Sequence, residues 1–143
     1  MKGHEALLVL LLALGCGGAL RPVEIALNEE ECSLCRMAIS RRSFAAEAVT
    51  TSGAADFFDD IGCLVRWAAE RPPPEGTALF VVDFRDGSWL DATRAHFVRA
   101  ASLETPMGSG LAAFGSAETA GEEARRLGGQ VLDWGGLRGQ EPE

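Results

Sequence analysis

Short stretches in which apolar and polar residues alternate predict most of the β-strands of this chain. Between Arg21 and Leu27, valine, isoleucine and leucine occupy every second position, which is the period of a half-buried strand. Residues 77–84 are dense in β-branched and aromatic side chains, and the Asp86-Gly87 turn that follows predicts a hairpin. The same reasoning predicts further strands at residues 37–39, 43–53, 111–116 and 130–134.

Apolar residues at helical spacing predict one main helix over residues 59–70. Asp59 and Asp60 suit its first turn, because carboxylates are stabilised at the positive end of the helix dipole. Three prolines at residues 72–74 follow, and proline cannot continue a helix. The segment therefore predicts an amphipathic helix with a sharp end.

A second main helix is predicted between Ser116, a favourable N-cap residue, and the pair Gly128-Gly129, which ends it. Residues 92–100 predict a shorter helix, which carries His96. The tail at residues 136–143 has no apolar period and is expected to be loose.

The order of these elements indicates the fold class. Strands are followed by a helix, a hairpin, a short helix, a strand, a helix and a final strand. This order predicts an α+β fold with two unequal ββαβ-like lobes, antiparallel or mixed sheets and two main helices.

The N-terminal residues indicate export. Residues 6–14 are an unbroken apolar run behind Lys2, too short for the roughly 20 residues that span a bilayer, so residues 1–15 are expected to be a secretory signal peptide. The junction around Cys16 resembles the lipobox of bacterial lipoproteins, although Ala13 stands where leucine is usual. We expect a periplasmic protein anchored to a membrane by lipidated Cys16; a cleaved or buried free cysteine is the alternative.

Charge and motif content exclude several functions. The net charge is −8, and removing the signal peptide does not change it because Lys2 and Glu5 cancel. An acidic surface repels phosphate backbones, so nucleic acid is not an expected partner. The glycine-containing stretches lack phosphate-loop spacing, and no Ser/His/Asp set is present, so the chain is not expected to be an enzyme.

Three cysteines remain beyond Cys16, namely Cys32, Cys35 and Cys63, and an odd number cannot pair completely as disulfides. The C-x-x-C spacing of the first two suits a disulfide, half of a zinc site, a redox pair or a soft-metal site. Structural zinc normally requires four cysteine or histidine ligands, and no second pair exists. Thioredoxin-type exchange requires a helix that starts at the first cysteine, and no helical apolar stripe follows Cys35.

Two methionines favour a soft metal over a simple Cys32–Cys35 disulfide. Cu(I) prefers thiolate and thioether sulfur, whereas methionine is a poor ligand for zinc and for hard cations. If Met37 lies on a strand, it shares a face with Cys35, two residues earlier. Met107 lies between Pro106 and Gly108 in a turn that can present it outward, although methionine is ordinarily core filler.

Two further residues are possible additional ligands. Cys63 falls on the apolar face of the helix at residues 59–70, where a buried free cysteine that acts as a small hydrophobe is the favoured interpretation. His96 lies between Ala95 and Phe97, where a structural or exposed histidine is more common than a ligand.

Five segments, in order, resemble the NosL family of copper-binding lipoproteins, which assist the assembly of nitrous oxide reductase. They are "CSLCRM", "FFDDIGCLVRW", "FVVDF" with "SWLDA", "TPMGSGLAAF" and "GGQVLDW", and they extend from Cys32 to Trp134. The resemblance implies a two-lobed ββαβ fold and a single Cu(I) site. It also implies delivery of copper to the copper-sulfide centre of nitrous oxide reductase, through a membrane ABC-type assembly machinery.

By motif match, the resemblance implies that Cys35 and Met37 are ligands, with Cys32 close by and Met107 from a facing loop. Arg36 departs from the glycine expected between the second cysteine and the methionine. The implied organisation is a signal peptide at residues 1–15, a tether and first strand at 16–30, a NosL-like copper-binding domain at 31–135 and a loose tail at 136–143. Alternatives are delivery to another exported copper enzyme, mercury or organometal handling, and a disulfide-containing lipoprotein interaction module.

Overall fold

The computed structural model of the chain describes residues 18–140, so the expected signal peptide and Cys16 lie outside the described residues. The first lobe is built on a four-stranded antiparallel sheet with the order β2-β1-β3-β4. The helix α1 connects β2 to β3. The bounds of these elements are β1 Ala46–Val49, β2 Ala55–Phe58, α1 Ile61–Glu70, β3 Ala78–Val82 and β4 Trp89–Asp91.

The second lobe contains a three-stranded antiparallel sheet with the order β6-β5-β7. Its elements are β5 His96–Arg99, β6 Leu111–Phe114, α2 Ala117–Leu127, β7 Gln130–Leu132 and the C-terminal helix α3 Trp134–Gly139. Each lobe therefore follows the order strand, strand, helix, strand. The structure confirms the predicted α+β fold with two ββαβ-like lobes and two main helices.

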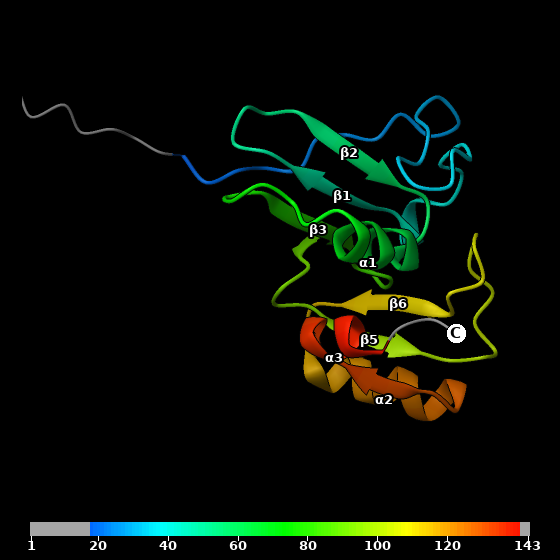
Figure 1. Ribbon diagram of the computed structural model, residues 1–143. Coiled ribbons are helices and arrows are strands. Elements are labelled where there is room, and N and C mark those ends of the chain that lie inside the picture. Colours follow the sequence, from blue (N-terminus) through cyan, green and yellow to red (C-terminus); the bar gives the residue numbers. More distant parts are fainter. Residues whose placement is uncertain (1–17, 141–143) are drawn as a thin grey trace, which may run out of the picture.

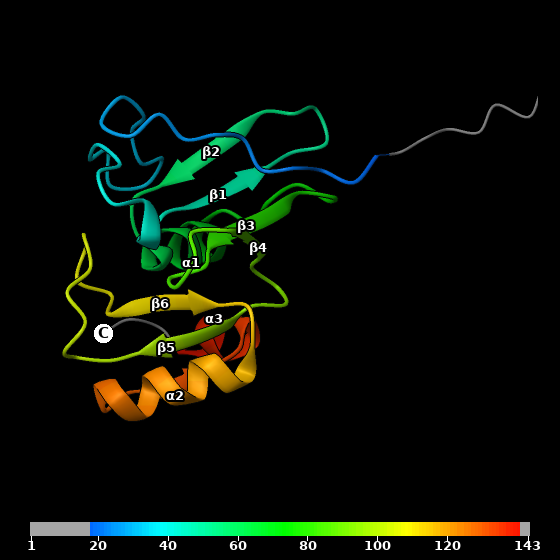
Figure 2. The ribbon, with the colours of Figure 1, turned by 180° about the vertical axis from the view of Figure 1, so that it is seen from behind.

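The two sheets are stacked, with α1 between them and α2 on the outer face of the second sheet (Figures 1 and 2). One hydrophobic cluster joins the inner face of the first sheet, α1 and the facing side of the second sheet. It includes Phe58, Leu64, Val81, Phe97, Leu111 and Leu137, all nearly or fully buried. Since this core is continuous, the two lobes form one folded unit.

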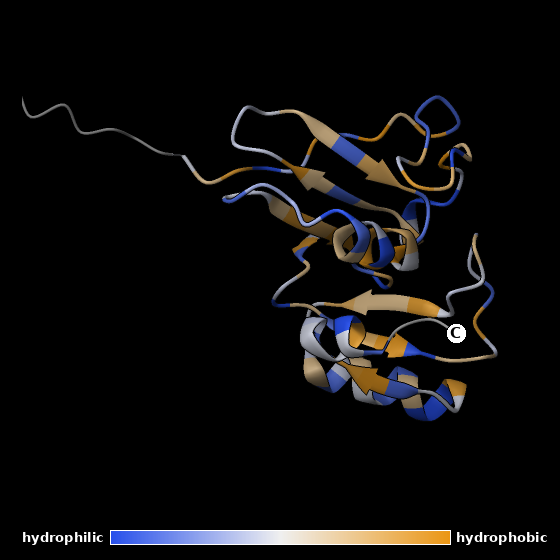
Figure 3. Cartoon of the chain, viewed as in Figure 1, coloured by the Kyte–Doolittle hydropathy of each residue, from blue (hydrophilic) through white to orange (hydrophobic). Residues whose placement is uncertain are grey.

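The remaining faces are covered in different ways. A second cluster packs α2 against the outer side of β5 and β6, through residues such as Val98 and Ala124. The strands are mostly apolar, whereas hydrophilic residues follow the exposed side of α2 (Figure 3). Within residues 18–140, no helix has both the length and the apolar character needed to cross a bilayer.

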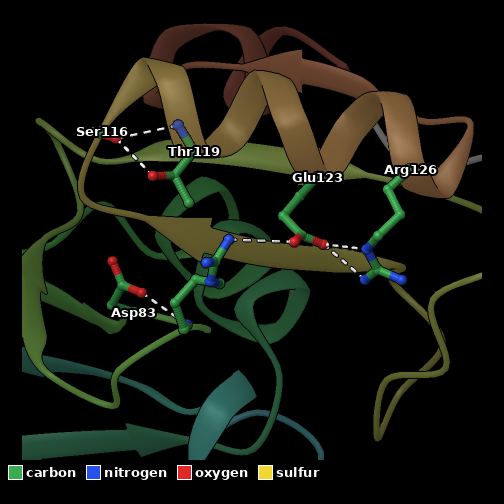
Figure 4. A network of polar contacts seen from close by, with 6 residues as sticks. Asp83, Ser116, Thr119, Glu123 and Arg126 are labelled. Carbon is green, nitrogen blue, oxygen red and sulfur yellow. Dashed lines mark hydrogen bonds and ion pairs between the residues drawn. The ribbon is translucent and has the colours of Figure 1, made fainter.

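A polar network also joins the lobes beside α2 (Figure 4). The carboxylate of Asp83, just after β3, accepts hydrogen bonds from the backbone N–H groups of Arg85 at 2.8 Å and Gly115 at 2.7 Å. Glu123 of α2 forms ion pairs with Arg85 at 3.4 Å and Arg126 at 2.7 Å. These contacts fix the end of β6 against the turn that follows β3.

The strand predicted from Arg21 to Leu27 is wrong. Val23 and Leu27 are exposed, whereas Ile25 is buried under the outer face of the first sheet. Residues 21–27 pair with no strand of the described chain, so their alternating pattern does not lead to a β-strand. The residues around Met37 also form no strand; they contain one isolated bridge, between Glu31 and Ala38.

The short helix predicted at residues 92–100 is wrong as well. A single turn does form after Asp91, whose side chain accepts a hydrogen bond from the backbone N–H of Thr93 at 2.9 Å. The chain then extends into β5, where Phe97 and Val98 pair with β6 on one side and β7 on the other. Burial of aromatic and β-branched side chains on both faces of a central strand outweighs the local helix propensity.

The tail expected to be loose is helical up to Gly139. Asp133 caps α3 by accepting a hydrogen bond from the backbone N–H of Gly136 at 2.7 Å, and Leu137 is fully buried in the main core. Three of the six residues of this helix are glycines, which weakens the sequence signal. The buried Leu137, the contact of Trp134 with Phe97 and the cap by Asp133 stabilise this short helix.

Glu47 is an ionisable residue in the middle of β1 and is fully buried. Its neighbours across the sheet are Phe57 and Phe80, and one carboxylate oxygen accepts a hydrogen bond from the backbone N–H of Val23 at 2.7 Å. Burial raises the pKa of this carboxyl to about 7, against the lowering effect of that N–H and of the positive charge of Arg42.

The raised pKa of Glu47 predicts a stability that falls as pH rises. Between pH 4.5, the ordinary pKa of a glutamate, and about pH 7, the folded protein binds more protons than the unfolded chain. The stability that the protonated carboxyl contributes is therefore complete below pH 4.5 and lost above pH 7. Glu47→Gln keeps an acceptor for Val23 and cannot ionise. We expect it to exceed the native protein in free energy of unfolding above pH 7 by about 3 kcal/mol.

Urea unfolding across this pH range measures the difference between the two proteins, and the exposed Glu75→Gln serves as the matched control with little expected change. A difference between Glu47→Gln and the native protein that does not vary with pH would contradict the argument.

Candidate metal centre

The C-x-x-C segment forms a tight turn that is fixed to the first sheet. The backbone N–H of Cys32 donates to the carbonyl of Met37 at 2.8 Å, and the N–H of Arg36 donates to the carbonyl of Cys32 at 3.0 Å. The N–H of Ser33 donates to the carbonyl of Phe57 in β2 at 2.8 Å. The turn is therefore held both by its own hydrogen bonds and by the neighbouring strand.

Arg36 adopts a left-handed backbone conformation, with φ of 66°. This region favours glycine and costs another residue about 1 kcal/mol or more. The glycine expected here from the resemblance would adopt it without strain. The guanidinium of Arg36 points to solvent and pairs with Glu31 at 3.0 Å.

Helix α1 brings the third cysteine to this turn. Cys63 is the third residue of the helix, and the sulfur atoms of Cys32, Cys35 and Cys63 all lie within 4.8 Å of one another. Cys32 is completely buried and Cys63 is 5% exposed, whereas Cys35 is partly exposed. All three are free thiols. Cys63 is buried in the core, as expected, and also belongs to a group of three sulfurs.

The three thiols differ in acidity. A hydrogen bond from the Cys63 thiol lowers the pKa of Cys32 to about 5, and nearby backbone N–H groups act in the same direction. Burial raises the pKa of Cys35, and the hydrogen bond to Cys32, together with burial, raises that of Cys63. At neutral pH the group therefore holds one thiolate, on Cys32, stabilised by a neighbouring thiol.

Met107 faces the same site from the loop between β5 and β6. This loop and the segment before β1 lie at the same end of the molecule as the N-terminus of α1, as both ribbon views show (Figures 1 and 2). A cleft of about 540 Å³ lies between them, lined by Cys35, Cys63 and Met107 among others. The structure thus places Met107 on the same cleft as Cys35 and Cys63, and Met107 is 48% exposed.

The other candidate ligands lie in different positions. Met37 is 57% exposed and is not among the residues that line the cleft, and because it lies on no strand, the shared face with Cys35 has no structural basis. His96 is a half-buried residue of β5, paired with Phe114, and lies outside the three-cysteine group. Cys16 lies outside the described residues.

Asp60 is a site residue whose role the sequence analysis missed. It was assigned to the first turn of the helix, where it is indeed the N-cap. Its carboxylate also accepts a hydrogen bond from the backbone N–H of Met107 at 2.9 Å. An aspartate before a helical apolar run signals a cap, but a contact across 47 residues has no local signal.

Among the described residues, the sulfur atoms of these three cysteines lie close enough together to hold a metal ion. The group consists of thiols alone, with one thioether at the edge of the cleft and no imidazole or carboxylate among its members. Such a donor set suits soft ions and suits hard cations poorly.

The fold and the site define a small α+β protein with a largely buried group of three thiols beside an interlobe cleft. The sequence profile of the NosL family matches residues 22–141, almost the whole described chain. The chain belongs to the NosL family.

A solved structure supports the same fold. The chain is similar to the crystal structure of the copper chaperone NosL from Shewanella denitrificans, with a TM-score of 0.67 and 22% sequence identity. The similarity covers 78% of this chain and 92% of that one. At this identity the similarity establishes the fold, and no curated protein matches the chain.

Proposed function

We propose that this protein is an exported copper(I) metallochaperone, anchored to a membrane through lipidated Cys16, that binds Cu(I) and delivers it for the assembly of nitrous oxide reductase. The observation that carries the copper site is the group of three cysteine sulfurs within 4.8 Å of one another at a cleft that Met107 also lines. The proposed role is binding and transfer, not catalysis.

The donor set supports Cu(I) over other ions. Three thiolates around one soft monovalent ion satisfy its preference for sulfur and for a low coordination number. Structural zinc would need a fourth ligand, and neither His96 nor another cysteine of the described chain belongs to the group. We assign Cys32, Cys35 and Cys63 as the inner ligands and Met107 as the thioether at the cleft.

The acidity of the thiols supports reversible binding. Cys32 is already a thiolate near neutral pH, so it provides a negative charge for an arriving cation. Cys35 and Cys63 are protonated and release protons when the ion binds, which makes the affinity dependent on pH. An acceptor protein that brings its own sulfur ligands into the cleft can then take over the ion by ligand exchange.

The exposed thioethers suit an oxidising compartment. Thioethers carry no proton and form no disulfides, so Met37 and Met107 can stay at the surface while the thiols of Cys32 and Cys63 are buried. In this proposal Met107 contributes directly to the site. Met37 is assigned to a later step, in which copper passes to an acceptor, because it does not line the cleft.

The client and the location rest on the family. Membership in the NosL family supports nitrous oxide reductase as the client and a membrane ABC-type machinery as the assembly partner. The lipobox-like junction at Cys16 supports a periplasmic, lipid-anchored protein. Delivery to another exported copper enzyme is the competing client.

The copper site predicts unequal effects of substitutions. We expect Cys63→Ala to lower Cu(I) affinity by about 100-fold or more and Met107→Ala by about 10-fold, since even partners of metal ligands are typically worth 10- to 100-fold. His96→Ala is the matched control and should not change the Cu(I) affinity. His96 pairs with Phe114, at the end of β5 and β6 away from the loop that carries Met107. Anaerobic competition with a Cu(I) chelator measures all three.

Equal affinities in Cys63→Ala and His96→Ala would exclude the three-cysteine site. Thiol counting on the non-reduced protein is the accompanying check, because a Cys32–Cys35 disulfide would leave one reactive thiol among the three cysteines instead of three.

The proposed client predicts selective transfer of copper. The copper-loaded mature protein should restore the copper content and activity of copper-depleted nitrous oxide reductase, supplied with its membrane assembly machinery, and a Cys63→Ala protein should not. A second exported copper enzyme provides the comparison. Equal transfer to both enzymes would remove the assignment of the client and leave the copper site intact.

The proposed anchor predicts the distribution of the protein after cell fractionation. The native chain should partition with membranes, because two acyl chains give stable attachment. Cys16→Ser should be found in the soluble periplasmic fraction, with the same Cu(I) affinity. Membrane association that persists in Cys16→Ser would contradict the lipid anchor.

A further inference from the structure

The carboxylate of Asp60 is completely buried and joins the two lobes at the cleft. One oxygen accepts a hydrogen bond from the backbone N–H of Gly62, in its own helix, at 2.7 Å. The other accepts from the backbone N–H of Met107 at 2.9 Å, and the hydroxyl of Ser109 donates to the first oxygen as well. Two of the three donors therefore belong to the loop of the second lobe.

The loop touches the helix directly at this point. A side chain at Gly62 would bring a Cβ atom to 2.6 Å from the Cβ of Ser109, so the helix start and the loop approach as closely as glycine allows. Gly62 immediately precedes Cys63. The contact therefore lies one residue away from a member of the sulfur group.

Few other interactions determine where Met107 lies. Its side chain is 48% exposed, so packing does not fix it. Within the loop, the backbone N–H of Gly108 donates to the carbonyl of Thr105 at 3.1 Å, and the N–H of Gly110 donates to the Thr105 hydroxyl at 3.2 Å. These bonds shape the turn internally, whereas the bonds to Asp60 attach it to α1.

We propose that Asp60 is a positioning residue that holds the Met107 thioether against the three-cysteine group, by fixing the 105–109 loop to the first turn of α1. This inference rests on the proposed copper function. The carboxylate of Asp60 forms no hydrogen bond to a sulfur atom; it acts through the backbone N–H of Met107 and through the hydroxyl of Ser109. A thioether that is held in place needs no loop ordering when the ion binds.

Neutralising Asp60 has two physical effects, the release of the loop and the loss of a negative charge near the bound cation. Only the first effect acts through the Met107 thioether. A loss of affinity that disappears once Met107 is replaced therefore indicates positioning, whereas a loss that persists indicates the charge.

The test is a cycle of four proteins: native, Asp60→Asn, Met107→Ala and the double variant. Asparagine is as good an N-cap residue as aspartate, but its NH₂ group cannot accept a hydrogen bond, so one attachment of the loop is lost. We expect Asp60→Asn to lower Cu(I) affinity by about 10-fold, a typical effect of a residue behind a metal ligand. In the Met107→Ala background it should cause no further loss.

A second readout needs no metal. The backbone amide of Met107 in the apo protein should exchange its hydrogen faster in Asp60→Asn than in the native chain, while the amide of Met37 serves as an internal control. Ser109→Ala, which removes one attachment and leaves the cap intact, should cause a smaller change of the same sign. This variant replaces Asp60→Asn if the latter does not fold.

The outcomes separate the two proposals. Asp60→Asn could lower the Cu(I) affinity equally in the native protein and in Met107→Ala, or in neither of them. Either result would overturn the positioning role of Asp60 and leave the copper site as proposed. If the native protein itself bound no Cu(I), the proposed function would fall, and with it the role of Asp60 in metal binding. Slow amide exchange at Met107 that depends on Asp60 would then establish only the attachment of the loop.

Discussion

Helix α1 packs against both sheets at once, and the rest of the structure depends on this packing. One face of the helix meets the inner face of the first sheet, and the main core continues from it to Phe97 and Leu111 of the second sheet. Because the helix is held on two sides, its first turn is a fixed point in the molecule. The C-x-x-C turn, Cys63 and the loop that carries Met107 all meet around that first turn.

The site reverses the usual distribution of sulfur residues. Methionine normally fills gaps in a core, yet both described methionines are about half exposed, while the thiols of Cys32 and Cys63 are buried. The proposed export to an oxidising compartment would give this reversal a chemical reason, because exposed thiols are lost to disulfides there and thioethers are not. Burial also places the Cys32 thiolate beside hydrogen-bond donors, since only those donors offset the cost of an ionised group in the core.

The sequence predicts the parts of the fold that local signals determine. The helix capped by Asp60, the hairpin around Gly87 and the helix between Ser116 and Gly128 all form as expected. Errors occur where a partner far along the chain decides the outcome. Residues 96–99 become a strand because two other strands pair with them, and residues 21–27 stay irregular because none does.

The same distinction explains the candidate site. The spacing of Cys32 and Cys35 is visible in the sequence, whereas the membership of Cys63 depends on β2, a strand that the sequence analysis did not predict. The turn at Ser33 is hydrogen-bonded to Phe57 in β2, and this strand ends only two residues before α1 begins. β2 is therefore hydrogen-bonded to the C-x-x-C turn and also leads into the first turn of the helix. Without that strand in the prediction, nothing placed Cys63 near the other cysteines. Cys63 was therefore interpreted first as a small core hydrophobe and only second as an additional ligand. A third sulfur in such a site becomes predictable once the strand next to the turn is identified.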